Sequence, residues 1–308
     1  LLWLALLAGG VLGAMMLHRQ APSGVAVTAQ KAEETAAVSA SPSGRKPVFP
    51  PVVTSGDLKL INFRFTEKED GPPRDAAPYK HRDRIRAEWE LSGYDTDAQG
   101  RTDLAYDIAV TDPDGVRLYG VQNAINQVAG AVKPIPMFFW LDLPGFAPRG
   151  DYRIEINVQD NMKKTDGRLT AGFTVEADLL PVSTQLEIRD FHLALSENGP
   201  PLNPAAIPPG TTVYMSGKVA GMAFRDDQVD LQLSFQVFGP DGKKLMDKPD
   251  FLTIKDSFSY HPATFFLPIS GHLGLPADIA KGTYTEKYLL TDRIGGTIRT
   301  YELMFDVR

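Results

Sequence analysis

The sequence predicts an all-β protein with two tandem β-sandwich domains, and three observations lead to this prediction. First, FRFTEKEDGPP at 63–73 returns as FHLALSENGPP at 191–201, with matched positions 128 residues apart. Second, apolar and polar residues alternate in segments throughout both copies, which is the period of a strand with one buried face. Third, turn signals separate about seven such segments in each copy, as in a β-sandwich.

The chain begins with an apolar segment, and no charge interrupts residues 1–17. An uncleaved membrane anchor needs about 20 apolar residues, whereas a cleaved signal peptide has a shorter apolar core with a small-x-small site close behind it. The candidate cleavage site, at 27–29, lies far beyond residue 17 and after a proline. Both interpretations of residues 1–19 predict an exported protein with its domains in the bacterial periplasm or on the cell surface. We favour a helix that anchors the protein in the membrane.

Residues 20–56 are rich in Ala, Ser, Pro, Thr and Val. Such a tract buries too little apolar surface to offset the entropy lost on ordering it. We therefore expect a flexible linker, which stiffens near its end where prolines cluster. The two sandwich domains are then expected at 57–178 and 179–308.

The repeat continues along both copies. RIRAEWELSG (84–93) matches TVYMSGKVAG (212–221), and both segments alternate as a strand does. DLAYDIAVTDPDG (103–115) matches DLQLSFQVFGPDG (230–242). Each ends in Pro-Asp-Gly, in which Pro presets the first corner of a turn and Gly accepts positive φ. The repeated Gly-Pro-Pro is expected to end the first strand of each domain, with a shared ligand loop as the alternative.

A third match lies near the end of each copy. MFFWLDLPGFAPRGDY (137–152) corresponds to TFFLPIS and LPADIAKGTY within 264–284, with five extra residues around SGHLG in the second copy. Both copies share Leu-Pro followed by Gly-x-Tyr, which places Gly150 before Tyr152 and Gly282 before Tyr284. We interpret these four residues as structural.

The Leu-Pro and Gly-x-Tyr element resembles the tyrosine corner of Greek-key sandwiches, in which a Tyr near the start of the sixth strand bonds to upstream backbone. Tyr152 and Tyr284 would be the corner tyrosines. The chain thus resembles tandem immunoglobulin-like or fibronectin-III-like domains of exported bacterial proteins. It departs from the immunoglobulin pattern in lacking the inter-sheet disulfide, and Trp89 lies on the second strand instead of the third.

Composition excludes several classes of protein. The net charge of −6 argues against a nucleic-acid partner, since such proteins carry a basic patch or stripe. The absence of cysteine excludes disulfides, thiolate metal ligands, a cysteine nucleophile and a lipid-modified cysteine. The sequence has no nucleophile elbow, phosphate-binding loop or dinucleotide fingerprint, so we expect a protein that is not an enzyme.

We expect no metal site and no cofactor, with calcium as the alternative. DTDAQGRTD (95–103) has acidic first and third positions and a sixth-position Gly, but Tyr106 stands where a calcium loop needs a bidentate Glu. We expect a polar turn there. His261 and His272 flank the FFLP segment and are the alternative zinc ligands, although solvated loop histidines are the simpler interpretation. Asp160 and Asp292 follow matched strands and are expected to cap turns.

YKHRDRIR (79–86) is the basic cluster of the chain. Lys80 and Arg82 belong to the loop that leads into a strand, whereas Arg84 and Arg86 alternate with core residues and are expected on its solvated face. A contact with an acidic partner or a lipid headgroup is the alternative.

MFFWL (137–141) is more apolar than a strand with one buried face requires. Either Phe138 and Trp140 or the other three residues point inward, and the outward set must be covered by a loop, by the neighbouring domain or by a partner. We expect the loop at 123–134 to cover it. Phe138 and Trp140, with Lys80 and Arg82, are therefore the candidate binding residues.

The function expected from these observations is that of a membrane-tethered spacer and protein-interaction module with an unknown envelope protein as partner. Edge pairing with a partner strand is one physical mode of such binding. The alternative is a carbohydrate-recognition module of the cell envelope, which would use exposed aromatic side chains such as Trp140 or Tyr94.

Overall fold

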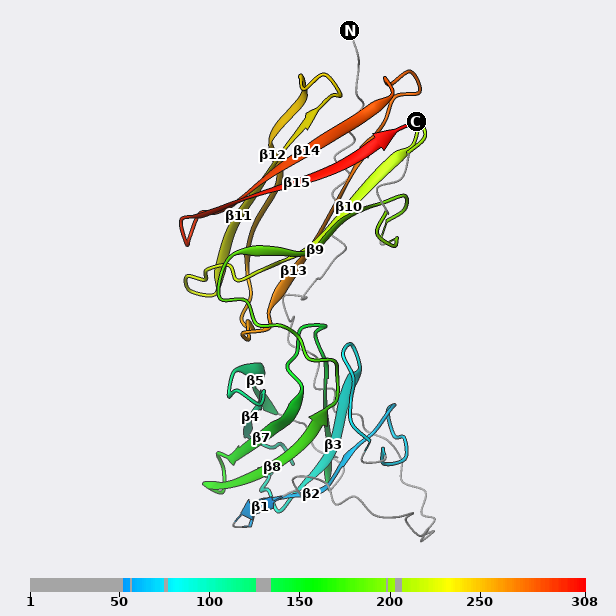
Figure 1. Ribbon diagram of the computed structural model, residues 1–308. Coiled ribbons are helices and arrows are strands. Elements are labelled where there is room, and N and C mark those ends of the chain that lie inside the picture. Colours follow the sequence, from blue (N-terminus) through cyan, green and yellow to red (C-terminus); the bar gives the residue numbers. More distant parts are fainter. Residues whose placement is uncertain (1–51, 56, 75–76, 126–133, 198, 203–206) are drawn as a thin grey trace. The chain divides into compact units, whose positions relative to one another are not determined.

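The computed structural model describes residues 52–55, 57–74, 77–125, 134–197, 199–202 and 207–308. These residues form an all-β structure of 15 strands in four sheets, without an α-helix (Figure 1). They divide into two compact units between Leu180 and Pro181. Within this part of the chain no helix is long and apolar enough to cross a membrane. The predicted anchor at 1–19 lies outside the described residues.

The N-terminal unit contains a three-stranded sheet with the order β2-β3-β6 and a five-stranded sheet with the order β1-β8-β7-β4-β5. All pairings in both sheets are antiparallel. The strands are β1 Val52–Ser55, β2 Lys59–Phe65, β3 Arg84–Ser92, β4 Leu104–Thr111, β5 Arg117–Ile125, β6 Ile135–Asp142, β7 Gly150–Asp160 and β8 Thr165–Val175.

The two sheets of this unit share one hydrophobic core. Strand β4 alternates strictly between buried and half-buried residues, as the period-two pattern predicts. Trp89 of β3 is 2% exposed and lies in the same buried cluster as Tyr152 of β7. The ring of Phe139 on β6 stacks on Tyr119 of β5 with centroids 5.8 Å apart. Such contacts between the sheets make the unit sandwich-like.

The C-terminal unit repeats this arrangement with the sheet orders β13-β10-β9 and β12-β11-β14-β15. Phe191 of β9 packs edge-on against Tyr288 of β14, with ring centroids 4.9 Å apart, so its two sheets also share a core. The strands are β9 Glu187–Ala194, β10 Thr212–Ala220, β11 Gln228–Phe238, β12 Lys244–Ser257, β13 Phe266–Gly274, β14 Gly282–Asp292 and β15 Thr297–Val307.

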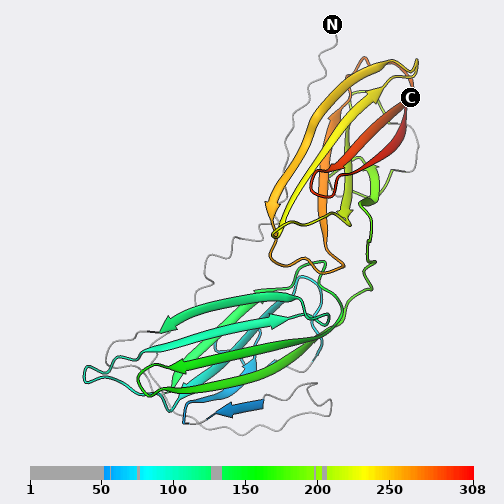
Figure 2. The same ribbon diagram turned by 90° about the vertical axis from the view of Figure 1, so that its left-hand side faces the viewer.

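Strand β1 lies inside the segment that the sequence assigns to the flexible linker. Residues 52–55 pair with β8 between Gly167 and Thr170, and Figure 2 shows the blue arrow of β1 beside β8. The linker prediction is therefore wrong for these four residues, because Val-rich segments pair readily with an open sheet edge. In the C-terminal unit, β15 is the strand that matches β8, and it is the last strand of its sheet.

The repeated Gly-Pro-Pro sequences form the same turn in both units. The Gly71 amide donates to the Lys68 carbonyl at 3.1 Å, and the Gly199 amide donates to the Ser196 carbonyl at 3.0 Å. Strands β2 and β9 end just before these turns. The Pro-Asp-Gly turns also match, since Gly115 and Gly242 have φ values of 83° and 74°. The repeated sequence therefore corresponds to a repeated fold, as the sequence predicts.

The tyrosine corner is present in both units. The Tyr152 hydroxyl donates to the Pro148 carbonyl at 2.8 Å, and the Tyr284 hydroxyl donates to the Ala280 carbonyl at 2.8 Å. These are the hydrogen bonds to upstream backbone that the sequence predicts.

The glycine two residues before each corner tyrosine is required for two reasons. Gly150 and Gly282 have φ values of 136° and 137°, a region that favours glycine. A Cβ atom at Gly150 would lie 2.7 Å from Cγ of Pro113, and one at Gly282 would lie 2.6 Å from Cγ of Pro240. Each glycine therefore lets the corner strand approach the Pro-Asp-Gly turn of its own unit.

The match between MFFWL (137–141) and TFFLPIS is wrong in register. On matched second strands, Arg86 pairs with Trp140 and Tyr214 pairs with His272. Trp140 thus corresponds to His272, and the five extra residues precede β13 instead of following it. Similar aromatic pairs mislead an alignment by eye, whereas cross-strand pairing is decided by the fold.

Candidate functional site

The candidate site is the outer face of the three-stranded sheet, formed mainly by β3 and β6. Met137, Phe139 and Leu141 are buried, so Phe138 and Trp140 point outward and are half-buried. This settles which of the two alternating sets faces the core. Residues 126–133, within the segment expected to cover the outward set, lie outside the described residues.

Arginines of the neighbouring strand cover the two outward aromatic rings. The guanidinium of Arg84 lies 4.4 Å from the ring centroid of Trp140, and that of Arg86 lies 4.4 Å from the ring centroid of Phe138. Such cation–π contacts order both partners. The Arg84 side chain is 59% exposed and pairs with Asp142 at 2.7 Å. We call Arg84, Arg86, Phe138 and Trp140 the arginine–aromatic face.

The prediction that Arg86 lies on a solvated face is wrong. Its side chain is only 11% exposed, since it lies between Phe138 and two carboxylates. Its Nε donates to Glu88 at 3.1 Å, and an Nη atom lies 3.8 Å from Glu69. An outward position on a strand does not guarantee solvation when neighbouring strands carry long side chains.

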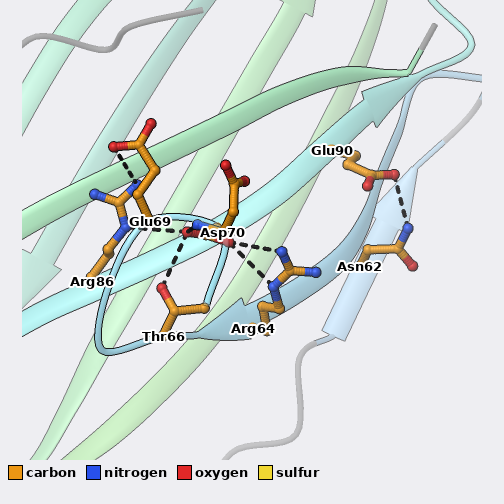
Figure 3. A network of polar contacts seen from close by, with 8 residues as sticks. Asn62, Arg64, Thr66, Glu69, Asp70, Arg86 and Glu90 are labelled. Carbon is orange, nitrogen blue, oxygen red and sulfur yellow. Dashed lines mark hydrogen bonds and ion pairs between the residues drawn. The ribbon is translucent and has the colours of Figure 1, made fainter. Parts of the chain in front are cut away.

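Glu88 lies on the same face of β3 as Arg86 and accepts hydrogen bonds from several groups. Figure 3 labels the residues of the surrounding polar network, among them Arg64, Thr66 and Asp70. Arg64 donates to Oε2 of Glu88 at 2.9 Å and Arg86 to its Oε1, and the Thr66 hydroxyl and Asp70 amide also reach Oε1, each at 3.2 Å. Burial raises the pKa of Glu88, but the hydrogen bonds from Arg86 and Arg64 outweigh it, so the pKa lies below its ordinary value. The carboxylate is therefore charged and satisfied, as a buried ion must be.

This network attaches the loop after β2 to the sheet. Glu69 and Asp70 come from that loop, and Figure 3 shows their backbone passing over β3 while Asn62 and Glu90 form a separate bond of 2.8 Å. A shallow hollow of about 110 Å³ lies between the loop and Phe138. The network thus orders the surface beside Phe138.

Lys80 and Arg82 lie at the end of the sheet where β3 begins and β6 ends. The backbone of Arg82, with φ of 70°, donates to the Leu143 carbonyl at 3.0 Å. The Lys80 amide donates to Asp83 at 2.7 Å, and its side chain is exposed. No described residue forms an ion pair with either side chain. Lys80 and Arg82 therefore lie at the end of the sheet near Trp140, whereas Phe138 lies in the middle of β6.

The aromatic residues suggested for sugar binding do not form an open platform. Tyr94 is 7% exposed, so its ring is unavailable to a ligand. Arg84 covers one side of Trp140. A stacked sugar needs an exposed aromatic ring, and the interpretation of Tyr94 as such a ring is wrong.

The loops considered for metals use their polar groups internally. Asp97 accepts the Gln99 amide at 2.9 Å and ion-pairs with Arg101 at 2.7 Å. His261 contacts Asp227 at 3.0 Å and stacks on Phe224. In the part of the chain that the structure describes, no three His, Asp or Glu residues gather as a metal site would require.

Asp160 and Asp292 cap turns, as predicted. Asp160 accepts the amides of Met162 and Lys163 at 2.9 and 3.0 Å, and Asp292 accepts those of Ile294 and Gly295 at 3.0 and 2.9 Å.

The same caps also join two loops in each unit. The second carboxylate oxygen of Asp160 accepts the Asp95 amide at 2.8 Å, and that of Asp292 accepts the Ala223 amide at 2.7 Å. Each carboxylate thus connects the turn after the sixth strand of the repeat to the loop after the second strand.

The arginine–aromatic face is absent from the matched surface of the C-terminal unit. Tyr214 and His272 occupy the places of Arg86 and Trp140, with rings 5.8 Å apart, and Ser216 pairs with Ser270 where Glu88 pairs with Phe138. The fold therefore does not require the face.

No family model and no curated protein matches the chain. Among solved structures, the C-terminal domain of wzt is similar, with 16% identity and a TM-score of 0.29 over 43% of this chain and 82% of that domain. A tetra-tandem repeat from the extending region of a large adhesion protein is 11% identical, with a TM-score of 0.24 over 83% of this chain and 50% of that one. A β-glucuronidase of Bacteroides uniformis is 11% identical, with a TM-score of 0.25 over 84% and 33%. Similarity at this level concerns the β-rich fold alone.

Proposed function

We propose that the protein is an exported, non-enzymatic interaction module, held at the membrane by residues 1–19, whose N-terminal unit binds another envelope protein. We further propose that both units are Greek-key sandwiches of the immunoglobulin-like or fibronectin-III-like kind. The tyrosine corners at Tyr152 and Tyr284 support this fold assignment.

The arginine–aromatic face is the observation that carries the proposal. Arg, Trp and Phe are enriched in protein interfaces, and Trp and Arg in the residues that dominate binding energy. Here Arg84 and Trp140 already contact each other across the strands. Because these side chains are ordered before binding, less conformational entropy is lost on association.

The loop at the end of the sheet supports the same proposal. Lys80 and Arg82 present cations without an ion-pair partner among the described residues, next to the partly exposed pair of Arg84 and Asp142. A rim of charges around an aromatic centre is typical of protein interfaces. The partner is expected to present acidic side chains toward this end.

Site-specific crosslinking in cells tests the proposal. A photoreactive amino acid replaces Trp140 in one full-length chain and the matched His272 in another. We expect a discrete protein adduct from position 140 and none from position 272. With the adduct partner purified, Trp140→Ala should weaken binding at least about tenfold. The proposal fails if both positions give the same adducts, or if Trp140→Ala binds the partner as the original protein does.

A further inference from the structure

A hollow of about 760 Å³ lies on the outer face of the five-stranded sheet of the N-terminal unit. The hollow is shallow and open to solvent, so a ligand would lie along the sheet surface. Strands β4, β5, β7 and β8 form its floor, and Figure 2 shows them side by side in one layer, from teal to green. The outward residues that line it are Ala105, Asp107, Gln122, Asn157, Gln159, Asp166 and Arg168.

A row of four polar side chains crosses the hollow at one register. Gln122 pairs with Asp107, Asp107 with Asn157, and Asn157 with Arg168. The Asn157 amide donates to Asp107 Oδ1 at 2.9 Å, and Arg168 Nε donates to Asn157 Oδ1 at 2.7 Å. Among the described residues, these bonds leave the second carboxylate oxygen of Asp107 and the Nη atoms of Arg168 for a ligand. Asp107, Asn157 and Arg168 are thus held in one orientation and still have polar atoms that can bind a ligand.

The fold does not require this polar row. In the C-terminal unit, Ser234 pairs with Leu289 and Leu289 with Thr300 at the places of Asp107, Asn157 and Arg168. Leu289 is 40% exposed there. The same sheet position therefore tolerates an apolar residue. Of the two units, the N-terminal one has the row of amide, carboxylate and guanidinium groups.

The chemistry of the lining restricts the ligand. An apolar ligand would bury these polar groups without partners, which is costly. A polyanion would meet two carboxylates, Asp107 and Asp166, against one guanidinium, Arg168. A peptide strand would find the backbone groups of the central strands already used in ladders to their neighbours. A neutral, hydroxyl-rich ligand offers both donors and acceptors to such planar side chains.

We propose that this hollow binds a neutral oligosaccharide. The site is distinct from the arginine–aromatic face, which lies on the other sheet of the same unit. Such binding needs no exposed aromatic ring, because amide, carboxylate and guanidinium groups can form hydrogen bonds with the sugar hydroxyls.

An array of neutral hexose, deoxyhexose and N-acetylhexosamine oligosaccharides, with uronic-acid oligosaccharides beside them, tests the proposal. The full-length chain is used in a detergent without a sugar headgroup. We expect binding to neutral oligosaccharides, and titration calorimetry with the best of them measures the affinity. Asn157→Leu places the residue type of position 289 in the row and should weaken binding at least about tenfold. The matched control, Leu289→Asn, should leave the affinity unchanged.

Two further variants keep the test decisive. Gln122→Ala changes an exposed side chain of an edge strand, so it should weaken binding without altering the melting temperature. Trp140→Ala should bind the oligosaccharide normally. The proposal is overturned if no neutral oligosaccharide binds, if only uronic-acid probes bind, if Asn157→Leu and Gln122→Ala both bind normally, or if Trp140→Ala abolishes binding.

Discussion

Glu286 is a carboxyl group inside the core of the C-terminal unit and is 1% exposed. The Tyr288 hydroxyl donates to its Oε2 at 2.7 Å. Burial raises the pKa of Glu286 to about 7, although this hydrogen bond acts in the opposite direction. In the N-terminal unit, Ile154 occupies the place of Glu286 and Ile156 that of Tyr288. A strand pattern of Tyr-x-Glu-x-Tyr was the signal for this group in the sequence, and period-two alternation puts all three residues on one face.

We predict that the C-terminal unit loses stability as pH rises. The folded pKa of Glu286, about 7, lies above its ordinary value of 4.5, so folding favours the protonated form. Its contribution is therefore fully present below about pH 4.5 and is lost as pH rises through about 7, a loss on the order of 3 kcal/mol. Glu286→Gln keeps an acceptor for Tyr288 and should remove this pH dependence.

The protein is unfolded with urea at pH 5 and at pH 8 to measure the effect. At each urea concentration a brief deuterium pulse at one fixed pH labels the unfolded molecules, and the label is measured in peptides from β14. Trp89 and Trp140 belong to the N-terminal unit, so their fluorescence follows that unit separately. Equal unfolding midpoints for β14 at both pH values, or an unchanged pH dependence in Glu286→Gln, would contradict the prediction.

At the scale of the element, the tyrosine corner joins the start of β7 in the N-terminal unit, and of β14 in the C-terminal unit, to the loop before it. Tyr152→Phe removes the bond to the Pro148 carbonyl, and Tyr284→Phe removes the bond to the Ala280 carbonyl. Each substitution should lower the free energy of unfolding of its own unit by about 1 kcal/mol, because the aromatic packing remains. Tryptophan fluorescence should detect the loss for Tyr152→Phe and be unaffected by Tyr284→Phe. A stability equal to that of the original protein for both variants would show that the corner bond is not stabilising.

Strand β1 is a second element with a testable role. Its pairing with Gly167–Thr170 covers part of the outer edge of β8. Deletion of residues 52–55 should therefore speed hydrogen exchange at the amides of 167–170 that face β1, because their hydrogen-bond acceptors are removed. Exchange in β15 of the C-terminal unit is the control and should not change. Equal protection of 167–170 before and after the deletion would contradict the pairing.

At the scale of the whole molecule, the proposed anchor at residues 1–19 precedes the first described strand, which begins at Val52. A chain that begins at Val52 should keep both folded units and should no longer fractionate with membranes, because the apolar segment at 1–17 is gone. A chain that begins at Lys59 loses β1 and should unfold at a lower urea concentration. Membrane fractionation and urea titration measure the two effects. If the chain that begins at Val52 stays in the membrane fraction, residues 1–51 are not the anchor.

The sequence by itself determined the all-β class, the repeat and the positions of its turns. The reason is that these features are local. The alternation at 104–111 indicates a strand with one buried face, and the Gly of Gly-x-Tyr indicates a positive φ, which Gly150 adopts. Only the tertiary structure decided which side chains meet across strands. Register placed Trp140 opposite Arg86, and it aligned Asp107, Asn157 and Arg168 into one row. Strand β3 pairs with β6, and β4 pairs with β7, across long separations in the sequence. The local alternation determines which face of the sheet a residue occupies, but it does not identify the distant residue that lies opposite.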